Sequence, residues 1–373
     1  MNVLYVSKAL VVAAYRDKLL ALSAHARVTA VVPHRWGAQA VEAARAAPAP
    51  VERCRALLHG HNHLHLYWRP ERLLERHRPD LVHIDEEPYS AATFQLAALC
   101  ARRGVPCLFF AWQNLDKRLP PPFAALRAAV FRRVAGGIAG TERAAEVLRR
   151  AGYRGPLAVI PQFGVSPERF RPDAAARAGT RARLGVADGE FVVGYAGRLL
   201  AEKGVHLLPP ALRELPRARL VVLGDGPERA RLRASAQRCG LAGRVHFAPA
   251  VASERMPAWL AAFDVLALPS LSRSGWVEQF GRVLVEAMAC GVPVVGSDSG
   301  EIPRVIGDAG QVVPEGDARA LGRALAELAA APELRARLAQ RGRARACALF
   351  SQERVAAATA AFYTQVLASG GGG

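Results

Sequence analysis

Short apolar runs alternate with amphipathic helical stretches along the chain, and this alternation constrains the fold more than any other feature. The runs are apolar on both faces, as in strands that helices cover from either side. The sequence therefore predicts parallel sheets in an α/β protein. The expected strands are NVLYVS, RVTAVVP, DLVHID, PCLFFAW, GGIAG and LAVIP in the first half, and FVVGYAG, RLVVLGDG, RVHFAP, VLALPS and PVVGSD in the second.

The strand–helix series occurs twice in 373 residues, which indicates two domains. The segment PQFGVSPERFRPDAAARAG lacks periodicity and is rich in proline, glycine and charge, so it marks the boundary. We predict two doubly wound domains, residues 1–165 and 166–350, and a final helix over 351–369 that packs on the second domain or crosses back to the first. The other expected helices cover 89–102, 122–134, 141–151, 203–213, 227–239, 281–290, 317–330 and 332–348.

The chain carries a net charge of +18, almost all of it from arginine. Such an excess is explained by biased residue usage or by an anionic partner, namely nucleic acid, a membrane surface or a phosphorylated substrate. The sequence contains no nucleic-acid-binding motif and no basic tract with interleaved aromatic residues, so we expect no nucleic-acid partner.

Cysteine usage and hydropathy predict a cytoplasmic protein. The six cysteines show no CxxC spacing, which is typical of reduced thiols and not of a disulfide framework or a zinc site. The start MNVLYVSKAL lacks a basic leader and a cleavage site, and we interpret it as a first strand instead of a signal peptide. No stretch of about 20 residues is free of charge, so we expect no transmembrane helix.

Ligands of open α/β sheets bind at the carboxyl ends of the strands, so the loops there are the candidate sites. The loop GRLLAEKG ends one strand with Gly197 and carries Arg198 and Lys203. Glycine allows close backbone approach, and the two cations suit a diphosphate. The alternative is a strand-to-helix turn with solvated charges.

A second loop, LGDGPER, contains Gly224 and places Pro227 where a helix is expected to begin. It lacks the third glycine and the later acidic residue of a dinucleotide fingerprint, so NAD binding is not indicated. A turn of this kind instead presents backbone N–H groups to an anion.

The third and most specific segment is WVEQFGRVLVEAMACGVPVVGSDSGEIPRVI, in which Glu278 and Glu286 lie eight positions apart. A helix that begins near Gly281 offers free N–H groups and its dipole to an anion. The two carboxylates, which only accept hydrogen bonds, suit hydroxyl groups of a sugar and a ribose. Taken in isolation, the two glutamates are better explained as a surface glutamate and a helix-packing glutamate.

GRLLAEKG, LGDGPER and the third segment occur in the order and at the separations found in family 4 glycosyltransferases, which the whole second half resembles. The resemblance implies a GT-B fold of two Rossmann-like domains with the active site in the cleft between them. It also implies a UDP- or GDP-sugar donor, transfer with retention, and neither a metal nor a cofactor. By motif position, Arg198 and Lys203 hold the diphosphate, Glu278 the sugar and Glu286 the ribose. Gly197, Gly224 and the backbone around Gln279, Phe280 and Gly281 complete the donor site.

The first half departs from that family. Lys8 follows the first strand, where relatives carry two glycines, and FFAWQN stands where relatives carry a histidine. We therefore expect the acceptor beside Lys8, Trp112 and Gln113, unless Trp112 and Gln113 merely cap a strand. The loop HIDEEPYS adds Asp85, Glu86, Glu87 and Tyr89, and its three acids bind acceptor hydroxyls or pair with local arginines.

Two further features leave alternatives open. His59, His61, His63 and His65 occur at every second position, as in a polar loop, an edge strand or, less favoured, a metal site. The helix expected at 122–134 packs its apolar stripe inside or lies on an anionic membrane.

These features together predict a retaining, metal-independent glycosyltransferase that acts on a hydroxyl of a glycan, a lipid-linked glycan or a small molecule. The alternatives are a non-catalytic sugar-nucleotide-binding protein and a GT-B-type sugar-nucleotide epimerase. The sequence does not determine the oligomeric state.

Overall fold

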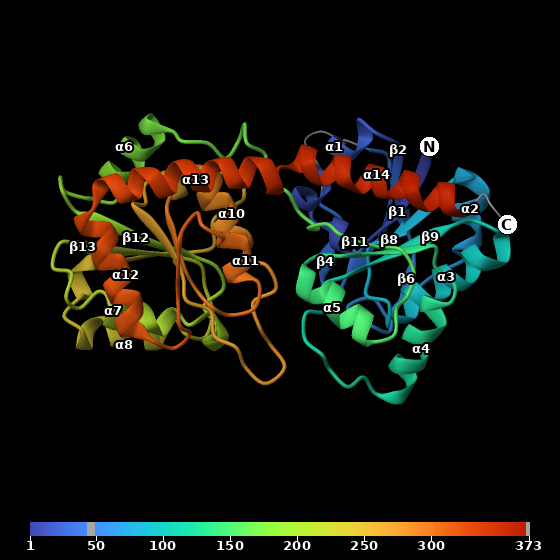
Figure 1. Ribbon diagram of the computed structural model, residues 1–373, viewed down its shortest axis with the longest axis horizontal. Helices are drawn as coiled ribbons and strands as arrows, with labels where there is room; N and C mark the ends of the chain where they lie inside the picture. Colours follow the sequence, from blue (N-terminus) through green and yellow to red (C-terminus); the bar gives the residue numbers. More distant parts are fainter. Residues whose placement is uncertain (43–48, 371–373) are drawn as a thin grey trace. The chain divides into compact units, whose positions relative to one another are not determined.

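The computed structural model describes residues 1–42 and 49–370, and the chain forms two compact units. Unit 1 contains Met1–Gly164 together with the chain from Gln352 onward, and unit 2 contains Val165–Ser351 (Figure 1). The chain therefore leaves unit 1 once and returns to it for the last helix.

Unit 1 is built on a seven-stranded parallel sheet in the order β11-β10-β9-β8-β1-β2-β5. Its strands are β1 (Asn2–Val6), β2 (Arg27–Pro33), β5 (Val51–Cys54), β8 (Leu81–Ile84), β9 (Cys107–Ala111), β10 (Gly136–Ala139) and β11 (Leu157–Val159). Its helices are α1 (Asp17–Ser23), α2 (Glu71–His77), α3 (Ala91–Arg103), α4 (Pro121–Phe131), α5 (Glu142–Arg150) and α14 (Gln352–Gly370). Two short hairpins, β3 (Arg35–Trp36) with β4 (Gln39–Ala40) and β6 (Ala56–Leu57) with β7 (Leu66–Tyr67), lie outside the sheet.

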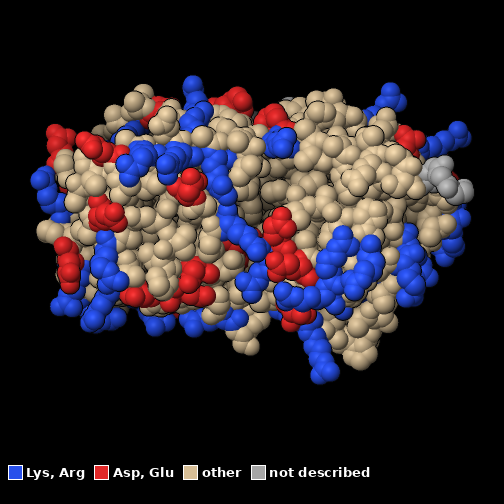
Figure 2. All heavy atoms as spheres, viewed as in Figure 1, with Lys and Arg blue, Asp and Glu red and all other residues tan. Residues whose placement is uncertain are grey.

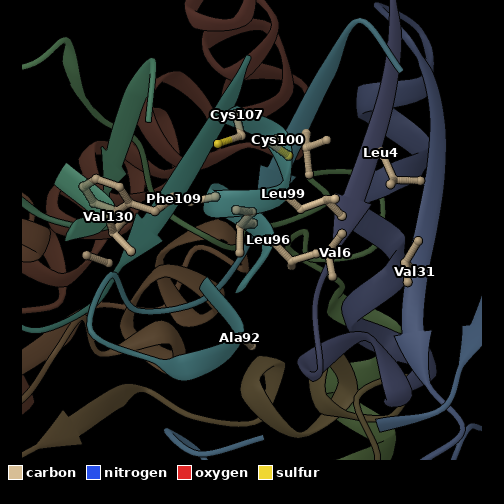
Figure 3. Packing of buried hydrophobic residues seen from close by; sticks show 14 of the residues in the cluster. Leu4, Val6, Val31, Ala92, Leu96, Leu99, Cys100, Cys107, Phe109 and Val130 are labelled. Carbon is tan, nitrogen blue, oxygen red and sulfur yellow. The ribbon is translucent and has the colours of Figure 1, made fainter. Parts of the chain in front are cut away.

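Apolar residues on both faces of the central strands explain why helices cover this sheet from two sides. In β1, Leu4 and Val6 belong to one buried cluster, whereas Val3 and Tyr5 belong to another. Figure 3 shows the first cluster, in which side chains of α3 meet β1 and β2. The period of two along the strand thus places alternate residues in two cores.

The last helix, α14, belongs to the second of these cores. It packs beside α1 (Figure 1), and its Phe362 and Val366 are buried there. The Tyr363 hydroxyl lies 2.6 Å from Nδ1 of His83 on β8. The sequence left the position of this helix open, and the structure places it in unit 1.

Unit 2 repeats the architecture with six parallel strands in the order β14-β13-β12-β15-β16-β17. Its strands are β12 (Phe191–Ala196), β13 (Ala218–Leu223), β14 (Val245–Ala248), β15 (Val265–Leu268), β16 (Val294–Ser297) and β17 (Gln311–Val313). Its longer helices are α6 (Ala174–Arg183), α8 (Arg229–Arg238), α10 (Arg282–Ala289), α12 (Ala318–Ala330) and α13 (Pro332–Phe350). Shorter helices are α7 (Leu208–Ala211), α9 (Met256–Ala261) and α11 (Ile302–Ile306).

The structure corrects two sequence-based expectations. The helix expected over 203–213 is replaced by two 3₁₀ turns and the single turn α7, because Pro209 and Pro210 cannot donate backbone hydrogen bonds. Pro227 precedes α8, which begins at Arg229, and therefore does not occupy the first helical position. The sheet strands β5 and β17 were not predicted, because neither is a continuous apolar run.

The described chain contains six cysteines, all free, and four of them are buried. Within residues 1–42 and 49–370 no helix has both the length and the apolar character needed to span a membrane. Lysine and arginine side chains lie among acidic ones over the viewed face of unit 2 (Figure 2), so its charge is not confined to one tract there.

Both sheets contain one point where the chain reverses its direction of winding. In unit 1 the reversal lies between β1 and β8, and in unit 2 it lies between β12 and β15. The loops that follow neighbouring strands diverge there, which leaves room for a ligand at the carboxyl ends of the strands.

Candidate nucleotide-sugar site

The reversal point of unit 2 brings the loop after β12 next to the loop after β15, since these strands are neighbours in the sheet. Gly197 and Arg198 follow β12, and Ser270 follows β15. Arg198 is exposed, and its backbone carbonyl accepts a hydrogen bond from the Tyr195 hydroxyl at 2.9 Å. Its backbone is thus held in place while its guanidinium faces solvent.

The glycine loops after β12 and β13 pack backbone against backbone. Gly197 donates to the Leu223 carbonyl at 3.0 Å, and Leu199 donates to the Asp225 carbonyl at 2.9 Å. Gly224 has φ +138°, and a Cβ there would lie 2.0 Å from the Gly197 oxygen. A glycine is therefore required at position 224, and its role in the structure is to let the two loops meet.

Lys203 and Glu278 form an ion pair at this reversal point. The Lys203 Nζ lies 2.7 Å from Oε2 of Glu278, and the Ser270 hydroxyl donates to the same oxygen at 2.7 Å. The lysine ammonium also lies 4.9 Å from the centre of the Trp276 ring, within range of a cation–π interaction. Sequence reasoning placed Lys203 and Glu278 in the site but missed Ser270 and Trp276.

The SGE segment after β16 fixes the loop that carries Glu278. Glu301 donates its backbone N–H to the Glu278 carbonyl at 3.1 Å. Gly300 has φ +57°, and a Cβ there would lie 2.0 Å from that carbonyl oxygen. The close approach requires glycine, so the motif residue Gly300 serves to hold the Glu278 backbone.

The α10 helix begins directly after this loop. Gly281 is its N-cap residue with φ +76° and has no side chain of its own to cap the helix. Phe280 points into the core, where its ring meets Phe350 edge to face at 5.6 Å, whereas Gln279 is exposed. The Phe280 side chain therefore anchors the helix start, and only backbone atoms of this residue are available to a ligand.

Glu286 lies one turn into α10 and pairs with Arg282, whose Nε is 2.8 Å from Oε1. Burial raises the pKa of the Glu286 carboxyl, and Arg282 counteracts that rise. Glu286 and Glu278 are thus separate carboxylates, each with its own cation, on one continuous loop–helix segment.

The reversal point of unit 1 contains the acceptor-side residues that the sequence predicted. Lys8, which follows β1, forms an ion pair with Glu86, which follows β8. Burial raises the pKa of Glu86 to about 7, although the nearby Lys8 ammonium lowers it. His65 lies 3.7 Å from the same carboxylate, and burial lowers the pKa of this histidine to about 4.

Asp85 and its partners occupy a more enclosed position. The Lys18 Nζ lies 3.1 Å from Asp85 Oδ2, and Gln162 donates to Oδ1 at 2.6 Å. Burial alone would raise the pKa of Asp85, but the charge of Lys18 and the hydrogen bonds lower it overall. Asp85 is buried and already has these partners, so it acts as a structural centre of this reversal point.

Glu87 is the third acid of the loop HIDEEPYS, which the sequence offered for the acceptor. Its Oε1 accepts the backbone N–H groups of Trp112 at 2.8 Å and Gln113 at 3.0 Å. Its Oε2 is buried and has no hydrogen-bond partner within the described chain. Burial raises the pKa of Glu87 to about 7, against the effect of the two N–H groups. Glu87 thus ties the end of β9 to the end of β8.

Trp112 and Gln113 use their side chains within the protein. The Trp112 indole donates to Gln162 Oε1 at 2.7 Å, and the Gln113 amide donates to the Leu115 carbonyl at 2.9 Å. The histidines at alternate positions do not share a strand face, because residues 58–65 form the loop between β6 and β7. His59, His61 and His63 are exposed there, whereas His65 is buried.

Within the part of the chain that the structure describes, no group of three or more His, Cys, Asp or Glu side chains is arranged to hold a metal ion. The helix α4, for which the sequence left packing and membrane contact open, buries Val130 in a core of unit 1. Phe131 packs against the same core.

The sequence matches two family models, Glycosyl transferase 4-like domain over residues 12–162 and Glycosyl transferases group 1 over residues 177–345. It is 32% identical over 283 residues to the lipopolysaccharide core biosynthesis glycosyltransferase LpsE of Rhizobium meliloti, covering 72% of this chain and 78% of LpsE. The chain therefore belongs to the group 1 glycosyltransferase family.

A second relative is the GDP-mannose-dependent alpha-(1-6)-phosphatidylinositol monomannoside mannosyltransferase of Mycolicibacterium smegmatis, 37% identical over 205 residues and 52% of this chain. The chain spans about half the length of that enzyme and of the D-inositol 3-phosphate glycosyltransferase of Streptomyces bingchenggensis, 53% and 52% respectively.

Solved structures share the fold. HepE of Anabaena, crystallised in complex with UDP, superposes with a TM-score of 0.78 at 22% identity and covers 98% of this chain and 100% of its own. Sucrose-phosphate synthase from Thermosynechococcus elongatus gives a TM-score of 0.76, also at 22% identity, over 99% of this chain and 100% of its own. Both units thus have the fold of GT-B glycosyltransferases.

Proposed function

We propose that the protein is a retaining glycosyltransferase that moves a sugar from a UDP- or GDP-sugar to a hydroxyl group, without a metal or another cofactor. The observation that carries this proposal is the Lys203–Glu278 pair at the reversal point of unit 2, with Arg198 exposed on the loop that follows the same strand as Lys203. Two cations and one carboxylate in that position suit a ligand with an anionic end and a hydroxyl-bearing end.

The donor diphosphate would bind Arg198 and Lys203, close to the backbone of Gly197 and Gly224. When the bond between the sugar carbon and the phosphate oxygen breaks, the nucleoside diphosphate gains negative charge. Fixed cations stabilise that charge as it develops, and the N-terminus of α10, which begins after Gly281, adds its dipole. The protein's own groups supply the charge that a divalent metal would otherwise provide.

Glu278 and Glu286 would accept hydrogen bonds from the donor's hydroxyl groups, Glu278 from the sugar and Glu286 from the ribose. Each now binds a cation that a ligand can share or replace. For retention, the acceptor oxygen forms its bond to the sugar carbon on the face that the phosphate leaves. The departing phosphate oxygen takes the acceptor's proton, so no protein base is required.

The acceptor would bind in unit 1, near Lys8, Glu86 and the Trp112–Gln113 turn. Two lysines face three carboxylates there, a composition that suits neutral hydroxyl groups better than phosphate. We propose a glycan, a lipid-linked glycan or a small hydroxylated molecule as the acceptor class. A cytoplasmic location, where nucleotide sugars are available, fits this role.

A thermal-shift screen against UDP, GDP, ADP and their sugar conjugates, with EDTA present throughout, tests the proposal. A ligand at about 100 times its dissociation constant stabilises the native state by about 2.7 kcal/mol, which the screen detects. We expect one nucleotide family to raise the unfolding temperature, and a Lys203→Ala variant to lose that shift.

No shift with any nucleotide, or shifts that require a divalent metal, would contradict the proposed donor site. Product analysis with glycan acceptors then separates transfer from its alternatives. Binding without turnover would identify a non-catalytic protein, and conversion of the donor without an acceptor would identify an epimerase.

A further inference from the structure

A short loop of unit 2 lies between β15 and Glu278, and it has a well-defined shape. We call residues 272–276, which read SRSGW, the SRSGW loop. Arg273 donates its backbone N–H to the Trp276 carbonyl at 2.8 Å, and Trp276 donates to the Arg273 carbonyl at 3.0 Å. Gly275 has φ +87°, which suits a tight turn between two such partners. The loop is therefore a closed two-residue turn.

Glu315 holds the first residue of this loop by two hydrogen bonds. Its Oε2 accepts the backbone N–H of Ser272, and its Oε1 accepts the Ser272 hydroxyl at 2.7 Å. Glu315 follows β17 and Ser272 follows β15, so the contact joins the ends of two strands that β16 separates in the sheet. A carboxylate that accepts two donors of one residue fixes the orientation of that residue as well as its position.

The backbone of Glu315 is itself fixed by the sheet. Its N–H donates to Oδ1 of Asp298 at 2.8 Å, and the Asp298 N–H donates to the Val313 carbonyl at 3.0 Å. Asp298 follows β16 and Val313 ends β17, and these two strands pair with each other. The sheet therefore positions the Glu315 carboxylate, and the carboxylate positions the loop.

A chain of hydrogen bonds leads from Ser272 to Glu278. The Ser272 hydroxyl lies 3.2 Å from the Ser299 hydroxyl, and Ser299 Oγ accepts the Glu278 N–H at 3.5 Å. An ionised carboxylate only accepts, and a hydroxyl has one proton to donate, so the directions are determined. Ser272 donates to Glu315, and Ser299 therefore donates to Ser272. The charge of Glu315 thus polarises the hydrogen bonds of this chain in one direction.

The same loop also contacts the other member of the ion pair. Leu271, directly before the loop, donates its N–H to the Glu202 carbonyl at 2.7 Å, and Glu202 precedes Lys203 in the chain. The Trp276 ring at the end of the loop lies 4.9 Å from the Lys203 ammonium. The SRSGW loop therefore lies between Glu315 and both residues of the Lys203–Glu278 pair.

We propose that Glu315 is a positioning residue of the donor site. It holds the SRSGW loop, so that Trp276 stays beside the Lys203 ammonium and the Glu278 carboxylate keeps its place. Ser272 is exposed and β17 is an edge strand, so loss of this contact should change the stability of the fold little. Its main effect should fall on the loop and on the ligand. The inference rests on the donor site proposed above and adds a residue from outside its motifs.

Two measurements on the full chain test the proposal. The first needs no ligand: hydrogen–deuterium exchange over residues 271–278 should become about threefold or more faster in Glu315→Ala, because two donors of the loop lose their acceptor. The second is calorimetric titration with UDP, GDP and ADP. For the nucleotide that the wild type binds, the dissociation constant of Glu315→Ala should rise about three- to tenfold. Ser272→Ala retains the backbone hydrogen bond and should show a smaller rise, and the double variant should bind no more weakly than Glu315→Ala.

Glu327→Ala is the matched control, because Glu327 of α12 also accepts an exposed hydrogen bond at β17, from the Gln311 amide at 2.8 Å. It should exchange and bind as the wild type does, and all variants should unfold at the wild-type urea concentration. Unchanged exchange over 271–278 in Glu315→Ala would overturn the proposal.

So would unchanged nucleotide affinity in Glu315→Ala when Lys203→Ala loses it. A loss of affinity that comes with an equal loss of unfolding free energy would indicate a structural role instead. A wild type that binds none of the three nucleotides would contradict the donor site itself, and this inference with it.

Discussion

The two units place a lysine–glutamate pair at the same point of the same topology, yet the surroundings of the two pairs differ. In unit 2, Lys203 and Glu278 have Arg198 and the start of α10 nearby. In unit 1, Lys8 and Glu86 lie among further carboxylates. One reversal point therefore suits an anion and the other suits neutral hydroxyl groups. The sheet determines where a ligand binds, and the loops determine which ligand it is.

The largest expected effect tests the anionic half of this comparison. Lys203→Ala should lower kcat/KM for sugar transfer by about 10²–10³, because it removes a preorganised cation from the leaving diphosphate. Initial rates at varied donor concentration measure this change. Lys8→Ala, its counterpart in unit 1, should leave nucleotide affinity unchanged, and exposed Lys117→Ala is the control. Equal losses of nucleotide affinity in the Lys203 and Lys8 variants would remove the distinction between the two sites.

An intermediate effect concerns the buried carboxylates of unit 1. Burial raises the pKa of Glu87 from 4.5 to about 7, so the folded state binds this proton more tightly than the unfolded state. Its contribution to stability is therefore present at low pH and is lost as pH rises from about 4.5 to about 7. In Glu87→Gln, the decline in unfolding free energy between about pH 5 and pH 8 should shrink by about 1–3 kcal/mol.

Urea denaturation at several pH values measures that decline. Comparing pH values within one variant cancels the cost of the unpartnered amide group that the glutamine introduces. Glu75→Gln on α2, whose side chain is 56% exposed, should show the wild-type pH dependence. An unchanged pH dependence in Glu87→Gln would mean that this carboxyl does not carry the proton.

The smallest expected effect concerns Trp276 of unit 2 and the affinity for the nucleotide. Trp276→Leu removes the ring that faces the Lys203 ammonium and should weaken nucleotide binding about two- to fivefold. Isothermal titration calorimetry measures the change, and Trp276→Phe should recover most of it. Trp259→Leu on α9, whose ring stacks on His246 at 6.2 Å, is the control. Identical losses in the Trp276 and Trp259 variants would indicate a general packing effect.

The strands and the two-unit organisation follow from local information. Runs such as FVVGYA are apolar on both faces, and this requirement of a buried parallel strand is visible in any short window. The expected helix over 203–213 failed because two prolines outweigh the amphipathic pattern. The position of α14 could not be predicted, because its apolar side chains fit either unit.

The motifs of the candidate site could be recognised in the sequence, but the contacts between their side chains could not be predicted. Arg198, Lys203, Glu278 and Glu286 lie in recognisable segments, and the structure assigns each its neighbours. Ser270 lies outside the motifs and Trp276 opens the third one, and their contacts with Glu278 and Lys203 arise only in the tertiary fold. Glu87 was one of three adjacent acids, and only its two backbone donors distinguish it from Asp85 and Glu86.

The return of the chain to unit 1 has a consequence for synthesis on the ribosome. Residues 165–351 form a continuous unit, so unit 2 can fold while the last segment is still inside the exit tunnel. Unit 1 starts first but finishes last, because Phe362, Tyr363 and Val366 fill its core. Until they emerge, one face of its sheet lacks part of its cover, and the nascent first half exposes apolar surface of the kind that chaperones bind.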